Sequence, residues 1–175
     1  MRPGGRQRRL CADRDRLGPA FLFPGVGFGG SCFPKDVRAL ERLAHEVGYD
    51  FQIITAVHHV NDIQKRILVD RIRSHYGGDL SGRRFALWGL AFKPRTDDVR
   101  EAPSLAVIET LLASGARVSA YDPEAVGNTW RLLEDRIEYA ANVYDPVQMA
   151  ALGFVYTSIG RPSGKRTAVP EPTIG

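Results

Sequence analysis

The sequence predicts an α/β chain in which a helical first part is followed by a short unit of strands and helix. Two observations carry this prediction. In residues 34–76, apolar residues recur at three- and four-residue spacing, which is typical of helices with one buried face. From residue 84 onward, short apolar runs alternate with a helical stretch, which is the order of a βαβ unit.

Two helices are expected in the first part. Proline suits the first turn of a helix, so the first helix begins near Pro34, and Gly48 ends it. The second helix spans about residues 51–76 and stops at Gly77. Over ~25 residues it would run about 40 Å, which is long for a small domain and indicates a connector or a dimer contact. Its expected apolar stripe consists of Ile53, Val57, Val60, Ile63 and Ile67.

The second part predicts a sheet that stays incomplete. Its apolar runs are short, and proline and glycine bound the helix between the first two strands. The pattern ends too early to complete the sheet, so we expect an uncovered edge and a weakened C-terminal half. The expected elements are strands at 84–90 and 117–121, a loop at 91–102, helices at 103–112 and 130–135, and a strand at 137–140.

Composition excludes several classes of function. The net charge is +4, but the excess of arginine and lysine lies near the two ends and forms no basic stripe, so we expect no nucleic-acid binding. No apolar run reaches the roughly 18–20 residues of a membrane span, and no apolar core follows the basic start, so we expect no membrane segment or secretory signal. Two cysteines, Cys11 and Cys32, are too few for a disulfide framework and indicate reduced thiols in a cytoplasmic protein.

A loop dense in glycine precedes the first helix. Residues 25–30 fit the pattern G-x-G-x-x-G of a dinucleotide site. Such a site requires a strand directly before the glycines and a helix directly after them. Pro24 interrupts any strand and the helix begins only near Pro34, so the context argues against a dinucleotide site here.

Cys32 follows this loop at the N-terminus of the expected helix. The positive end of the helix dipole and the nearby Lys35 would lower the pKa of its thiol and make the thiolate available. Asp36 lies where a carboxylate can steer a proton or a water molecule, so these residues form the parts of a site for covalent catalysis. A structural cysteine in a tight turn is the alternative.

Residues 25–36, Gly-Val-Gly-Phe-Gly-Gly-Ser-Cys-Phe-Pro-Lys-Asp, closely resemble the active-site loop of the UDP-glucose/GDP-mannose dehydrogenase family. The resemblance implies that Cys32 is the nucleophile in a double oxidation of the sugar C6 alcohol, in which NAD accepts two hydrides. It implies that Asp36 assists water or proton transfer. The residues that it assigns to the sugar pocket are Gly27, Phe28, Gly29 and Lys35.

A second string, Leu-Ala-Phe-Lys-Pro-Arg-Thr-Asp-Asp-Val-Arg-Glu-Ala-Pro-Ser at residues 90–104, resembles the same family. It follows a strand, and ligands of open α/β sheets bind at the carboxyl ends of strands. Two cations on this loop suit two phosphate groups. The resemblance assigns Phe92 and Lys93 to the nucleotide-sugar and Arg100 to NAD, whereas a solvated charged loop is the alternative.

Other segments extend the resemblance. Phe21 and Leu22 match the family's sugar-facing loop, and Arg16 matches an arginine that reaches the substrate of a neighbouring subunit. The helix at 51–76 matches the helix through which such enzymes form homodimers. Two adjacent histidines lie on that helix, but their side chains point about 100° apart, so we expect no metal site.

The resemblance covers residues 16–161 and predicts the domain organisation. It implies a central helical dimerisation domain and a Rossmann-like UDP-binding domain, without the family's N-terminal NAD domain. A block of the family is missing at Tyr144-Asp145, so we expect the UDP-binding domain to be truncated internally. The predicted parts are an unmatched basic leader at 1–17, the active-site loop and helical domain at 18–83, the UDP-binding domain at 84–161 and a disordered tail at 162–175.

These resemblances imply an enzyme, or a fragment of one, that oxidises UDP-glucose to UDP-glucuronate with NAD. The residues around Cys32 favour the UDP-glucose branch of the family, while GDP-mannose and UDP-N-acetylated sugars stay open as substrates. A non-catalytic module that binds nucleotide-sugar or forms dimers is the other class of function.

Overall fold

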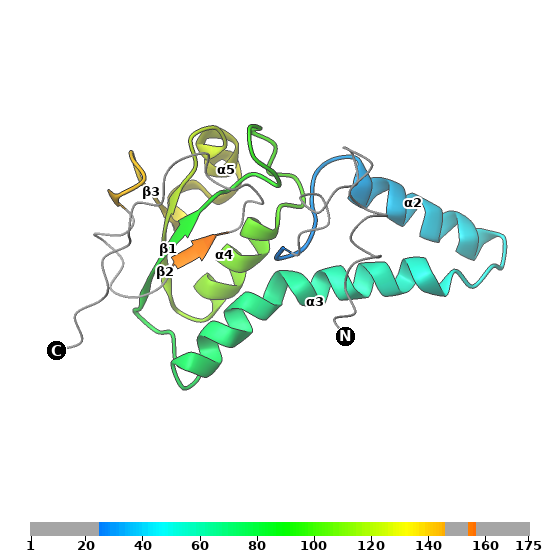
Figure 1. Ribbon diagram of the computed structural model, residues 1–175, viewed down its shortest axis with the longest axis horizontal. Helices are drawn as coiled ribbons and strands as arrows, with labels where there is room; N and C mark the ends of the chain where they lie inside the picture. The colour runs from blue at the N-terminus through cyan, green and yellow to red at the C-terminus, as the bar shows by residue number, and fades with distance from the viewer. Residues whose placement is uncertain (1–24, 146–153, 157–175) are drawn as a thin grey trace, which may run out of the picture.

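The computed structural model describes residues 25–145 and the backbone of residues 154–156. Helix α2 (Phe33–Glu46) and helix α3 (Gln52–His75) form an antiparallel hairpin, and α3 continues beyond α2 to the α/β part of the molecule (Figure 1). Gly48 follows α2 with a φ of 71°, a left-handed conformation that glycine adopts easily. The predicted helix stop at this residue is therefore confirmed.

The α/β part contains a parallel sheet with the strand order β3-β2-β1-β4. Strand β1 lies in the middle and pairs in parallel with both β2 and β4, and β3 extends the sheet beyond β2. The fold class predicted from the sequence is thus confirmed. The elements in chain order are β1 (Arg84–Trp88), α4 (Pro103–Ala113), β2 (Arg117–Tyr121), α5 (Val126–Leu133), a 3-10 turn η1 (Glu134–Arg136), β3 (Glu138–Tyr139) and β4 (Phe154–Tyr156).

The structure departs from the sequence-based expectation at the sheet edge and at the start of helix α5. Strand β4 pairs with β1, so the sheet edge that we expected to be uncovered carries a fourth strand. Helix α5 begins at Val126 instead of residue 130, because the buried Thr129 donates through its backbone and its hydroxyl to the Ala125 carbonyl and so extends the helix towards β2. The predicted leader, the predicted tail and most of the chain beyond Tyr144-Asp145 lie outside the described residues.

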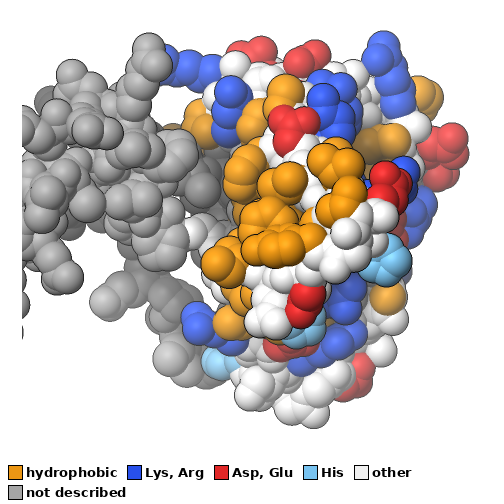
Figure 2. All heavy atoms as spheres, turned by 90° about the vertical axis from the view of Figure 1, so that its right-hand side faces the viewer, with side chains coloured by type: hydrophobic (Ala, Val, Ile, Leu, Met, Phe, Trp, Pro, Cys, Tyr) orange, Lys and Arg blue, Asp and Glu red, His pale blue; other side chains and the backbone are white. Residues whose placement is uncertain are grey.

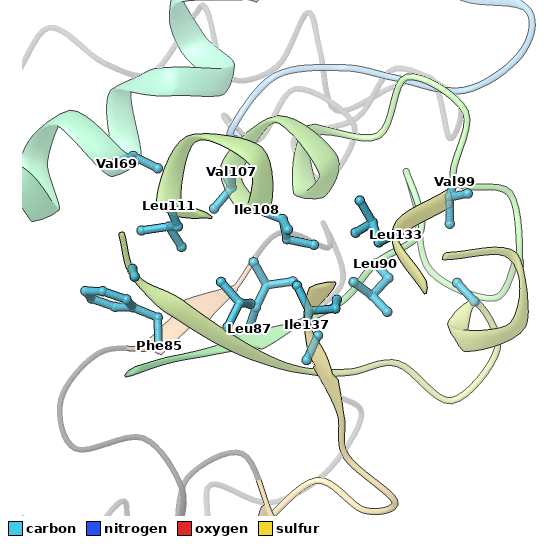
Figure 3. Packing of buried hydrophobic residues seen from close by; sticks show 14 of the residues in the cluster. Val69, Phe85, Leu87, Leu90, Val99, Val107, Ile108, Leu111, Leu133 and Ile137 are labelled. Carbon is cyan, nitrogen blue, oxygen red and sulfur yellow. The ribbon is translucent and has the colours of Figure 1, made fainter. Parts of the chain in front are cut away.

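The core lies between the sheet and helix α4. Val107, Ile108 and Leu111 of α4 face Phe85 and Leu87 of β1, and all five side chains are fully buried (Figure 3). The second half of α3 joins the same cluster through its own apolar side chains and packs against α4. Burial of this kind is the main stabilising term in folding, so it fixes the helical hairpin to the sheet.

A buried carboxylate fixes the loop after β1. One side-chain oxygen of Asp122, Oδ2, accepts hydrogen bonds from the amides of Leu90 (2.7 Å) and Ala91 (3.2 Å). The other oxygen, Oδ1, accepts from the amides of Glu124 (2.8 Å) and Ala125 (2.9 Å). Asp122 therefore joins the carboxyl ends of β1 and β2 and sets where the loop with the second family string begins.

Helix α3 buries a different face from the one that its apolar stripe predicted. Ile53, Val60 and Ile63 of the predicted stripe are exposed, with 72%, 61% and 51% of their surface accessible. The buried residues of α3 are Asn61, Lys65 and Val69, which follow one another at four-residue spacing. Within the described residues, no helix is both long enough and apolar enough to cross a membrane.

Candidate active site

Cys32 is the residue that directly precedes helix α2. Its side chain is a free thiol and is exposed in this structure. Its carbonyl accepts the hydrogen bond of the Asp36 amide (2.9 Å), and its Sγ lies 3.7 Å from the Ser31 hydroxyl. The thiol therefore lies at the positive end of the helix dipole, where negative charge is favoured.

The glycine loop before Cys32 is held on helix α3. Asn61 binds both backbone groups of Phe28, since its Oδ1 accepts from the amide (2.7 Å) and its Nδ2 donates to the carbonyl (3.2 Å). Gln64 donates to the carbonyl of Gly25 (2.7 Å). A methyl group on Gly27 would lie 2.9 Å from both the Asn61 Oδ1 and the Lys65 Cγ, so the close approach to α3 requires glycine there.

The same loop also packs on the second family string. The Gly30 amide donates to the carbonyl of Arg100 (2.8 Å). A methyl group on Gly29 would overlap the backbone of Glu101, and one on Gly30 would lie 2.8 Å from the Phe92 ring. Two strings that are separated by helices α2 and α3 in the chain are thus in direct contact.

Two charged residues lie where these strings meet. Arg100 forms a two-pronged ion pair with Asp98, with both nitrogen–oxygen distances at 2.9 Å. The hydrogen bond from Arg100, together with a further one from Ser31, holds the pKa of Asp98 below its usual value. The hydrogen bond to Asp98, followed by the charge of Asp98, raises the pKa of Arg100.

A shallow groove of about 350 Å³ opens beside Ser31, the residue before Cys32. Its walls come from the glycine loop, from α2, from the second string and from α4 and α5. Three cations and one carboxylate line it, and each cation is paired with a carboxylate. The lining residues are Gly30, Ser31, Lys35, Arg38, Arg100, Glu101, Leu105 and Leu132.

Several predicted residues lie outside the contact between the glycine loop and the second string. Lys35 and Asp36 are exposed on the first turn of α2 and face each other at 3.5 Å. Lys93 is exposed, with its Nζ 5.1 Å from the centre of the neighbouring Phe92 ring. The predicted substrate residues outside the described residues are Arg16, Phe21 and Leu22.

Sequence reasoning missed the supports of the cysteine loop. Asn61 and Gln64 hold the loop from α3, and Lys65 lines its approach, but all three look like ordinary polar positions of a helix. One signal was available, because Asn61, Lys65 and Val69 share one face at four-residue spacing. Polar residues on the same face as a buried valine indicate a partner that only the folded chain supplies.

Comparison with known proteins assigns both parts of the chain to one family. Residues 8–63 match the central domain of the UDP-glucose/GDP-mannose dehydrogenase family, and residues 86–159 match its UDP binding domain. The chain belongs to this family.

Similar proteins include several dehydrogenases of nucleotide-sugars. UDP-glucose 6-dehydrogenase of Pseudomonas aeruginosa is 41% identical over 203 positions, which cover 89% of this chain and 45% of that protein. UDP-glucose 6-dehydrogenase YwqF of Bacillus subtilis is 44% identical over 133 positions, which cover 76% of this chain and 30% of that protein. The chain thus spans less than half the length of these relatives.

Solved structures agree in fold. A UDP-glucose dehydrogenase from the archaeon Pyrobaculum islandicum superposes with a TM-score of 0.78 at 35% identity, over 87% of this chain and 35% of that chain. A GDP-mannose dehydrogenase of Pseudomonas aeruginosa superposes with a TM-score of 0.72 at 26% identity, over 89% of this chain and 37% of that chain. The fold is therefore shared by members that are named for different nucleotide-sugars.

Proposed function

We propose that this chain carries the nucleophile and the nucleotide-sugar cleft of an NAD-dependent UDP-glucose 6-dehydrogenase. One observation supports this most directly: the exposed Cys32 directly precedes α2, on a loop that is seated against the segment after β1. The relatives named as UDP-glucose 6-dehydrogenases favour UDP-glucose over GDP-mannose or UDP-N-acetylated sugars as the substrate.

Cys32 supplies the covalent chemistry in this proposal. Its thiolate adds to the C6 aldehyde of the sugar, which gives a thiohemiacetal. Once C6 has been oxidised to the level of an acid, it is joined to the same sulfur as a thioester. Water then cleaves the thioester and gives the carboxylate and the free thiol. A soft nucleophile that is also a good leaving group suits both steps. Asp36, on the first turn of α2, would steer the water.

Among the described residues, Arg100 is the one that we assign to NAD. The cofactor would accept two hydrides, and Arg100 in the groove beside Ser31 would meet one of its phosphates. The glycines of residues 25–30 pack instead on α3 and on the backbone of Glu101.

Lys93 would hold the diphosphate of the substrate. It lies on the loop at the carboxyl end of β1, beside Phe92, and the ring of Phe92 packs on the glycine loop. Gly27, Phe28 and Gly29 would line the sugar pocket with backbone groups. Arg16, Phe21 and Leu22 would complete it from outside the described residues.

Calorimetric titration of the purified chain with UDP-glucose tests this cleft. Saturable binding is expected, and Lys93→Ala should weaken it by about tenfold or more, because a charge-assisted bond to phosphate is lost. Arg117→Ala is the matched control, since Arg117 is an exposed cation at the first residue of β2, the opposite end of the parallel sheet. Equal affinity of the parent chain and Lys93→Ala would contradict the assignment.

Dimerisation through the helical hairpin is part of the proposal. Large apolar side chains are exposed along α2 and α3, and Figure 2, which faces the tip of the hairpin, shows hydrophobic side chains gathered there. An exposed apolar surface of this kind is typical of a protein–protein contact. The exposed residues are Leu40, Leu43, Val47, Tyr49, Ile53, Val60 and Ile63.

Val60→Lys is expected to turn a dimer of the chain into a monomer, because it places a charge in the apolar contact. Light scattering coupled to size-exclusion chromatography measures the mass directly. Asp62→Lys is the control, since Asp62 is exposed on α3 and lies about 200° around the helix from Val60. A parent chain that runs as a monomer at all concentrations would rule this interface out.

A non-catalytic module that binds nucleotide-sugar is the second candidate. Such a chain would bind UDP-glucose and depend on Lys93 without reducing NAD. Absorbance at the NADH band during incubation with both compounds separates the two functions.

A further inference from the structure

We propose that Glu101 is a positioning residue that fixes the Cys32 loop in place by joining α2, α3 and the loop after β1. The proposal deepens the function above and rests on it, since it assigns Glu101 to the support of the same thiol. Glu101 does not touch Cys32. It acts through the elements on either side of the cysteine.

Both carboxylate oxygens of Glu101 are engaged. Oε1 lies 2.8 Å from a guanidinium nitrogen of Arg38, which is on the second turn of α2, just after Cys32. Oε2 lies 3.6 Å from the ammonium of Lys65, whose side chain is only 11% exposed on α3. One carboxylate thus ties the helix that begins at the nucleophile to the helix that carries the loop.

The backbone of Glu101 packs directly against the glycine loop that precedes Cys32. Its φ of 54° lies in the left-handed region, which is unfavourable for a residue with a side chain. In this conformation its carbonyl faces Gly29 so closely that a methyl group on Gly29 would overlap it. The residue before it, Arg100, accepts the hydrogen bond of the Gly30 amide.

These two roles depend on each other. A left-handed conformation at a non-glycine residue persists only where its surroundings hold it. The ion pairs with Arg38 and Lys65 are the contacts that hold the Glu101 side chain. Without these ion pairs, the backbone of Glu101 can leave the left-handed conformation. The contacts that it and Arg100 make with Gly29 and Gly30 would then be lost.

The carboxyl group of Glu101 is ionised near neutral pH. The hydrogen bond from Arg38, followed by the charges of Arg38 and Lys65, holds the pKa of this carboxyl below its usual value. A carboxylate close to a thiolate disfavours the thiolate through simple repulsion. Electrostatics alone would therefore make Cys32 more reactive when Glu101 is neutralised, whereas loss of positioning makes it less reactive.

Glu101→Gln in the full chain tests the proposal. The matched control is Glu109→Gln, because Glu109 forms a two-pronged pair with Arg136 (2.8 Å each) on another face of the same domain. The side chains of Glu101 and Glu109 are similarly exposed, at 39% and 51%. Both substitutions remove one carboxylate charge from an ion pair, but only one of them touches the cysteine loop.

The first measurement is amide hydrogen exchange at Phe28 and Gly30. We expect exchange at both to be faster by about tenfold in Glu101→Gln and unchanged in Glu109→Gln, because only the former releases the loop. Arg38→Gln, which removes one of the two partners, should change exchange in the same direction and by less. Unchanged exchange in Glu101→Gln and Arg38→Gln would overturn the proposal.

The second measurement is the rate of alkylation of Cys32 by iodoacetamide at neutral pH. Tryptic peptides separate Cys32 from Cys11, and we expect Glu101→Gln to slow alkylation of Cys32 by about threefold relative to Glu109→Gln. Faster alkylation in Glu101→Gln would show a purely electrostatic effect and overturn the proposal. If Cys32 of the parent chain reacts no faster than Cys11, the proposed nucleophile fails, and hydrogen exchange still decides the role of Glu101.

Discussion

Asp122→Asn is expected to lower the free energy of unfolding by roughly 2–4 kcal/mol. The two carboxylate oxygens of Asp122 accept four backbone hydrogen bonds, from Leu90, Ala91, Glu124 and Ala125. Asparagine has the same shape, but its amide group would direct N–H donors at two of these backbone donors. A buried N–H without an acceptor is costly, so the ends of β1 and β2 should separate.

Urea unfolding followed by circular dichroism measures this loss. Asp135→Ala provides the control, because Asp135 is an exposed residue of the turn η1 and its removal should change stability by no more than about 0.5 kcal/mol. Because Asp122 sets where the loop with Phe92 and Lys93 begins, Asp122→Asn should also weaken UDP-glucose binding at temperatures where the variant is folded. A variant as stable as the parent chain would contradict the role of Asp122 as the link between the two strand ends.

Gly29→Ala is the second substitution with a large expected effect. The added methyl group would overlap the carbonyl of Glu101 and lie 3.0 Å from the Cα of Ala102, and both neighbours are backbone atoms that cannot rotate away. Overpacking of this kind costs about 1–3 kcal/mol. We expect the cysteine loop to move away from the backbone of Glu101. The melting temperature should then be lower, and alkylation of Cys32 should be slower.

Gly127→Ala separates this clash from the general effect of replacing glycine. Gly127 lies in α5, and a methyl group there meets no atom within 4 Å. Alanine should therefore stabilise the helix by about 0.5–1 kcal/mol. The two substitutions are chemically identical and should shift the melting temperature in opposite directions, and a Gly29→Ala variant as stable as Gly127→Ala would remove the basis for a tightly seated loop.

Local pattern was sufficient to predict most elements of this fold. The helices α2, α3 and α4 and the strands β1 and β2 lie where their apolar spacing and their bounding proline and glycine residues placed them. The fourth strand could not be predicted in the same way, because β4 is stabilised by pairing with β1, far away in the chain. A period of two residues reports which face of a strand is buried and not which strand lies beside it.

The exposed stripe of α3 shows a second limit. Ile53, Val60 and Ile63 have the spacing of a buried helix face, yet the folded chain leaves them exposed and buries Asn61 and Lys65. The spacing of apolar residues identifies the apolar face of a helix. It does not tell whether residues of the same chain pack against that face. The polar face is buried because the glycine loop supplies the hydrogen-bond partners of Asn61 and because Glu101 pairs with Lys65.

The sequence by itself determined the family, through two strings of residues around Cys32 and Lys93, and the order of the helices and strands. Only the tertiary structure decided which residues support the thiol. Asn61, Gln64 and Lys65 carry no recognisable motif, and Glu101 lies in the second string without a role that the string assigns. Each acts by meeting a backbone group or a charge that lies more than 25 residues away in the chain. Contacts over such separations are made only when the chain folds, because burial of the core brings α3, the glycine loop and the loop after β1 together.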